Sequence, residues 1–103
     1  MNATTDTISS KLSVDPDFRE IVEMFVNEIP DRVATLIGAY DGRQWADLRR
    51  GAHQLKGAGG GYGYPELTTV ASQLEYAVDA AQGEEAIKAR LDGLVELCTR
   101  LRV

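Results

Sequence analysis

The sequence predicts an all-α protein, an up-and-down antiparallel four-helix bundle with an additional N-terminal helix. Three observations support this fold class. Apolar residues recur at helical spacing over most of the chain, no stretch shows the strict alternation of a half-buried strand, and the connections between the periodic stretches are short. With 103 residues, of which 44% are hydrophobic, the chain has room for one domain with a single core.

The first periodic stretch begins at Asp15-Pro16, where the aspartate can cap a helix and the proline suits its first turn. Its apolar positions continue to Tyr40. Pro30 interrupts them, either as a kink or as the start of a second helix. Residues 1–14 are rich in Ser and Thr and are expected to form a flexible arm, which leaves residues 15–103 as the bundle domain.

Three further helices are expected. One presents an apolar face from Trp45 to Leu55 and runs into a cluster of glycines. The next begins at Pro65 and is ended by Gly83, because glycine favours helix C-termini. The apolar face of the last helix extends as far as Leu101.

Composition excludes several classes of function. Sixteen acidic and eleven basic residues give a net charge of −5, which argues against a nucleic-acid partner. The single cysteine, Cys98, cannot form an internal disulfide or build a zinc site alone. No apolar run approaches the roughly 20 residues of a membrane span, and the N-terminus does not resemble a signal peptide. A cytoplasmic protein without a membrane partner is therefore expected.

The chemistry is expected at His53, the only histidine, which helical geometry places on the flank of its helix and away from the apolar face. A neutral imidazole is a good nucleophile near physiological pH. Nearby cations could offset the roughly two negative charges of a phosphoryl group, and Gly57, one turn along, would leave the ring accessible. The cations around His53 are Arg43, Arg49, Arg50 and Lys56, against one anion, Asp47.

The sequence around this histidine resembles the signature of histidine-containing phosphotransfer (HPt) domains. The segment 53–57 reads His-Gln-Leu-Lys-Gly, two small residues follow it, and Gly63 lies ten positions after the histidine. Glu75, 22 positions after the histidine, also matches the family. The resemblance covers roughly residues 16–102 and is specific mainly over 52–75, although the run Gly59-Gly60-Gly61 is richer in glycine than usual.

The resemblance implies a role for each matching residue. His53 would be phosphorylated on Nε2, Lys56 would offset the phosphoryl charge, Gly57 would give access, and Glu75 would hydrogen-bond the other ring nitrogen. The residues expected to bind the partner are Arg49, Arg50 and Gly60. The partners would be a response-regulator receiver domain and an upstream histidine kinase. The chain would be a monomeric phosphocarrier without a cofactor of its own, and Mg²⁺ would be held by the receiver domain.

Other functions remain open at this point. The chain could be a helical adaptor without chemistry, or a phosphoacceptor domain of a hybrid or chemotaxis-type histidine kinase. An autokinase dimerisation domain is disfavoured, because Gln54 follows the histidine and the expected downstream proline is missing. A metal-binding bundle is disfavoured because no Glu-x-x-His spacing occurs.

Overall fold

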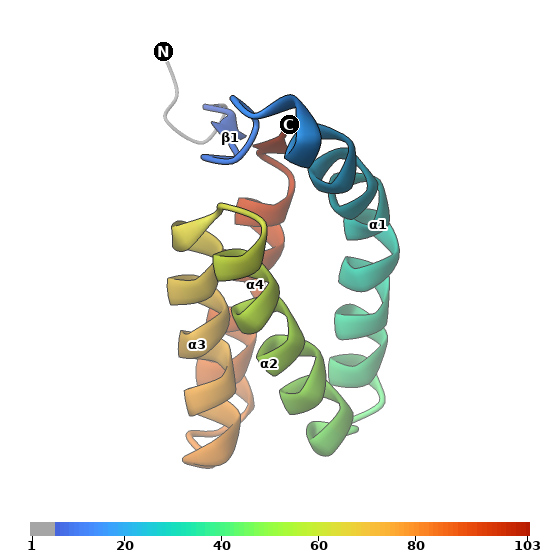
Figure 1. The fold of residues 1–103 in the computed structure, drawn as a ribbon. Coiled ribbons are helices and arrows are strands. Elements are labelled where there is room, and N and C mark those ends of the chain that lie inside the picture. Colours follow the sequence, from blue (N-terminus) through green and yellow to red (C-terminus); the bar gives the residue numbers. More distant parts are fainter. Residues whose placement is uncertain (1–5) are drawn as a thin grey trace.

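The computed structural model describes residues 6–103, which form four helices and one pair of two-residue strands (Figure 1). The helices pack in a ring, each against the next, with the fourth returning to the first, and consecutive helices run in opposite directions (Figure 1). The expected all-α fold is confirmed for this part of the chain. The elements are β1 (Ile8–Ser9), α1 (Pro16–Asp41), α2 (Trp45–Gly61), α3 (Pro65–Asp79), α4 (Glu84–Cys98) and β2 (Leu101–Arg102).

The first helix is continuous, so the described residues do not contain the additional N-terminal helix expected from the sequence. Pro30 lies inside α1, which spans 26 residues and begins after an aspartate cap at Asp15. A proline inside a helix removes one backbone hydrogen bond and costs about 3 kcal/mol or more. Apolar residues on both sides of it, Ile29 and Leu36, are nevertheless buried in the same core, and their packing keeps the helix in one piece.

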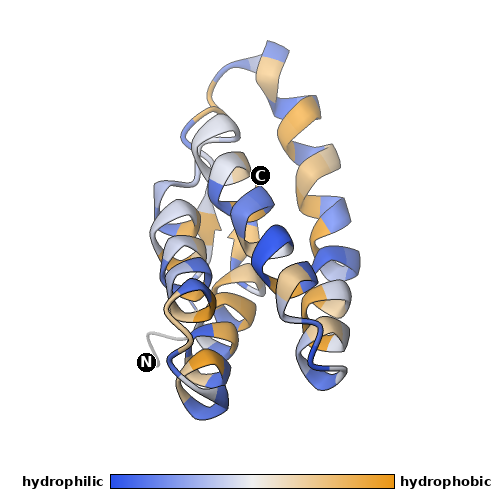
Figure 2. Cartoon of the chain, turned by 90° about the horizontal axis from the view of Figure 1, so that it is seen from below, coloured by the Kyte–Doolittle hydropathy of each residue, from blue (hydrophilic) through white to orange (hydrophobic). Residues whose placement is uncertain are grey.

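The core lies between the four helices and is almost entirely apolar. Every helix carries both hydrophilic and hydrophobic stretches, as amphipathic packing requires (Figure 2). Cys98 is buried, as its position on an apolar stripe predicts. No helix within residues 6–103 is both long and apolar enough to cross a membrane. The largest fully buried side chains are Tyr64, Phe25, Leu36, Leu48, Leu55, Leu67, Leu74, Leu91, Leu94, Leu101 and Val22.

Both chain ends differ from the sequence expectations. The last helix ends at Cys98, because Leu101–Arg102 forms β2 and pairs in parallel with β1. The N–H of Ile8 also donates to the carbonyl of Arg100 at 2.7 Å. The expected flexible arm over 1–14 therefore needs correction from residue 8 onward, whereas its residues 1–5 lie outside the described residues. Pairing between chain ends this far apart leaves no local signal in the sequence.

The chain ends hold the connection between α2 and α3. The Ser10 hydroxyl donates to the carbonyl of Tyr62, and the buried Tyr64 donates its hydroxyl to the carbonyl of Arg102 at 2.5 Å. Gly63 has a φ of +84°, a left-handed conformation that favours glycine. The C-terminal end of α2 is thus fixed by both ends of the chain.

Helices α2 and α3 approach each other closely at Gly59. A Cβ added there would lie 2.5 Å from Thr68 Oγ1, 2.7 Å from the Thr68 nitrogen and 2.9 Å from the Tyr64 carbonyl oxygen. The Thr68 hydroxyl also donates to the carbonyl of Lys56 at 2.8 Å. This part of the glycine run therefore serves close packing of α2 against α3.

We expect Gly59→Ala to lower the free energy of unfolding by about 1–3 kcal/mol, because the new methyl group overlaps backbone atoms that cannot move away. Gly93→Ala is the matched control. A Cβ at this exposed position in α4 meets no described atom within 4 Å beyond its immediate helix neighbours, so alanine should stabilise the helix by about 0.5–1 kcal/mol. Urea unfolding measures both values. Equal effects of the two substitutions would show that α2 and α3 are not packed closely at Gly59.

Candidate functional site

His53 lies on the flank of α2, with its ring directed toward α3 and solvent. The buried face of the helix is formed by Leu48, Ala52 and Leu55, and the side chain of His53 is 61% exposed. The structure therefore confirms the expected exposed position. The ring nitrogen Nδ1 lies 2.8 Å from Oε2 of Glu75.

Glu75 is the centre of the site. It projects from α3, and its side chain is only 10% exposed, whereas its partners are exposed to solvent. Lys56 Nζ donates to Oε1 at 3.0 Å, and the His53 ring meets Oε2. Arg49 Nη2 lies 3.7 Å from the same Oε2. The antiparallel packing of α2 and α3 thus brings His53, Lys56 and Glu75 together, as the sequence resemblance implies.

The contact to Glu75 determines which ring nitrogen is free. An ionised carboxylate only accepts hydrogen bonds, so Nδ1 of a neutral His53 ring must carry the proton that it donates. The lone pair is then on Nε2. Because the imidazole is largely exposed, this lone pair is available to a reactive group from outside the chain.

The carboxyl group is held in its ionised form. Hydrogen bonding from Lys56 is the largest influence and lowers the pKa of Glu75 below its ordinary value. Burial opposes this shift, and the hydrogen bond from His53 adds to it. At neutral pH, Glu75 is therefore a charged acceptor facing the histidine.

Asp79 is a member of the cluster that sequence reasoning missed. Its Oδ1 accepts a hydrogen bond from Arg49 Nε at 2.5 Å, and this bond is the main reason that the pKa of Arg49 is raised. The available signal was spacing: Asp79 follows Glu75 by four residues, so both lie on the same face of α3.

The remaining predicted site residues lie outside this cluster. Arg50 is exposed and pairs with Asp47 on its own helix at 3.1 Å. Gly57 and Gly60 lie on the exposed surface of α2. A Cβ at Gly57 would meet no described atom within 4 Å beyond its immediate helix neighbours. The surface one turn from His53 is therefore open.

A model of the Hpt domain family matches residues 20–103. The chain belongs to this family. No curated protein and no solved structure matches it. The match includes the whole of α2 and α3, and Hpt domains act in phosphotransfer in two-component signalling.

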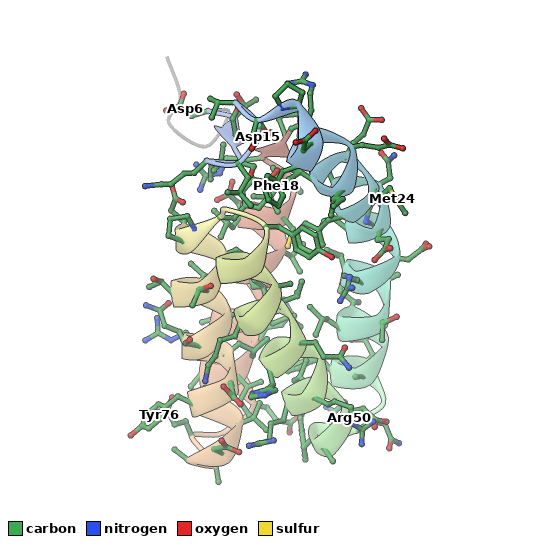
Figure 3. The ribbon with its side chains drawn as sticks, in the orientation of Figure 1. Asp6, Asp15, Phe18, Met24, Arg50 and Tyr76 are labelled. Atoms are coloured by element: carbon green, nitrogen blue, oxygen red, sulfur yellow. The ribbon has the colours of Figure 1, made fainter. Side chains whose placement is uncertain are left out.

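An apolar groove lies beside α2 of this Hpt domain. Phe18 and Ile21 border it from α1 and are 45% and 47% exposed; Figure 3 shows Phe18 on the first turns of α1. Both residues belong to the apolar positions between Pro16 and Tyr40, yet the structure leaves them partly exposed. The groove is lined by Leu12, Phe18, Ile21, Val22, Gly57, Ala58, Gly61 and Tyr62.

No group of three His, Cys, Asp or Glu side chains within residues 6–103 could hold a metal ion. Two carboxylates, Glu75 and Asp79, and two basic side chains, Lys56 and Arg49, form the described cluster beside His53. Among these groups, the ammonium of Lys56 is the cation that could face an anion on the ring.

The lowered pKa of Glu75 predicts a loss of stability in acid. A carboxyl group whose pKa is lower in the folded state stabilises the fold above its unfolded-state pKa of about 4.3, and this contribution is lost as the pH falls through the folded value. We therefore expect the difference in unfolding free energy between wild type and Glu75→Gln to be largest at neutral pH and to shrink below about pH 4.3. Urea unfolding from pH 3 to 7 measures it. A difference that stays constant with pH would contradict the assignment.

Proposed function

We propose that this Hpt domain carries a phosphoryl group on Nε2 of His53 and exchanges it with the aspartate of a response-regulator receiver domain. One observation carries the proposal. Nδ1 of the exposed imidazole is hydrogen-bonded to a buried carboxylate at 2.8 Å, which leaves Nε2 as the accessible nucleophile. The family match supports this reading.

The proposed step is a displacement at phosphorus. The Nε2 lone pair of His53 attacks the phosphorus of an aspartyl phosphate, a nitrogen–phosphorus bond forms, and the bond from phosphorus to the acyl oxygen breaks. The electron pair leaves with the partner's carboxylate. The proton on Nδ1 stays in place, so positive charge develops on the ring, and the carboxylate of Glu75 stabilises it. The reverse sequence returns the phosphoryl group to an aspartate.

The protein's own contribution is position and charge, which are the main requirements of phosphoryl transfer. Lys56 lies one turn after His53 and is 42% exposed, so its ammonium group can exchange Glu75 Oε1 for a phosphoryl oxygen. The Mg²⁺ that the reaction requires is assigned to the receiver domain.

The partner surface proposed here combines the open part of α2 with its apolar neighbour. Gly57 and Gly60 allow a close approach to the helix, and Phe18 and Ile21 offer apolar area beside it. Arg50 provides an exposed positive charge on the same helix. The upstream kinase, the monomeric state and the cytoplasmic location stay predictions from the sequence.

The decisive variant is His53→Gln. We expect radiolabelled phosphoryl transfer from a phosphorylated receiver domain to fall to background, because no other imidazole exists in the chain. Circular dichroism checks that the variant is folded. Undiminished label in this variant would overturn the proposal, and receiver binding without any transfer to the wild type would favour the adaptor function instead.

The access role of Gly57 is tested by Gly57→Gln. We expect the transfer rate to fall by at least about tenfold, because the new side chain occupies the approach to the ring. Stability should change little, since the Cβ meets no described atom within 4 Å beyond its immediate helix neighbours.

The matched control for this substitution is Gly93→Gln. Gly93 lies in α4, and a Cβ there has as much free space as one at Gly57. It should leave the transfer rate unchanged. Equal transfer rates in the two variants would exclude a steric role for Gly57.

A further inference from the structure

Two side chains of α2, the imidazole of His53 and the guanidinium of Arg49, face one oxygen of Glu75. Nδ1 of His53 lies 2.8 Å from Oε2, and Nη2 of Arg49 lies 3.7 Å from the same atom. The first distance is that of a hydrogen bond, and the second is slightly longer than a hydrogen bond allows. A small movement of the guanidinium would make Arg49 a competitor for the acceptor that orients the histidine.

Asp79 binds the same guanidinium. It accepts a hydrogen bond from Nε of Arg49 at 2.5 Å and lies one helical turn beyond Glu75 on α3. The guanidinium is thereby held on the Asp79 side of the cluster. Lys56 is held on the opposite side, through Oε1 of Glu75.

We propose that Asp79 and Arg49 are positioning residues, which reserve Oε2 of Glu75 for His53 and so keep the ring in the form with the proton on Nδ1. The consequence for phosphotransfer rests on the proposed function above. The effect on the ring proton does not, because it concerns the unphosphorylated protein alone.

Exposure shows why this pair is not simply a stabilising contact. The side chains of Arg49 and Asp79 are 47% and 46% exposed, and exposed ion pairs contribute little to folding. Asp79 is also the last residue of α3, where a negative charge opposes the helix dipole. We therefore infer that Asp79 acts mainly by positioning the guanidinium of Arg49.

The sequence alone gave Arg49 a different role, as a contact to the partner. In the structure, its nitrogens instead face two carboxylates of α3. The two roles differ in a way that can be measured without a partner, because only positioning predicts a change in the His53 ring when Asp79 is removed.

The experiment reads the ring proton directly. Long-range ¹H–¹⁵N spectra of ¹⁵N-labelled protein report the two neutral tautomers of His53, recorded about two pH units above the usual imidazole titration. The variants are Asp79→Ala, Arg49→Gln and the double variant. Asp47→Ala is the matched control, since it removes the same charge and releases Arg50 rather than Arg49.

We expect wild type to be mainly the form protonated on Nδ1. Asp79→Ala should lower the ratio of this form to the other by at least about threefold, because Arg49 then competes for Oε2. The double variant should return to the wild-type ratio, and Arg49→Gln and Asp47→Ala should keep it. An unchanged ratio in Asp79→Ala, or a shift that persists in the double variant, would overturn the proposal.

Phosphotransfer is measured in parallel. We expect the transfer rate of Asp79→Ala to fall by about three- to tenfold and to recover in the double variant. A wild-type protein that accepts no phosphoryl group would refute the proposed function, and the tautomer ratios would still decide the role of Asp79. A normal transfer rate in Asp79→Ala despite a shifted tautomer ratio would overturn the link from ring position to transfer.

Discussion

The site depends on one buried carboxylate between two helices. Glu75 is mostly shielded from solvent, yet it is charged, because Lys56 and His53 donate to its two oxygens. A buried charge without such partners would be strongly destabilising. The requirement to pair Glu75 therefore fixes where the exposed histidine points and which of its nitrogens faces solvent.

The helices that carry this carboxylate and its partners are held at close distance by features away from the site. Gly59 lets the backbone of α3 approach α2, and Thr68 bonds to the carbonyl of Lys56. The connection at Tyr62–Tyr64 is clamped by residues from both chain ends. A rigid support of this kind suits a group that must be presented to another protein without a surrounding pocket.

The arrangement is consistent with the proposed phosphoryl transfer by a small helical domain. In the proposed transfer, the chain supplies a nucleophile, a carboxylate that orients it and a nearby ammonium group. Metal coordination and the acid anhydride are assigned to the partner. In the same proposal, the apolar groove beside Gly57 offers the partner a surface close to the His53 ring.

Local signals in the sequence predicted the helical class, most helix starts and the exposed position of His53, because periodicity, proline positions and a single histidine can be read without the fold. The motif also indicated Lys56 and Glu75. Three features became visible only in the folded chain: Pro30 lies inside one helix, the chain ends pair as β1 and β2, and Arg49 faces Asp79. These outcomes depend on contacts between residues distant in the chain, where packing outweighs local preference and leaves no pattern to read in the sequence.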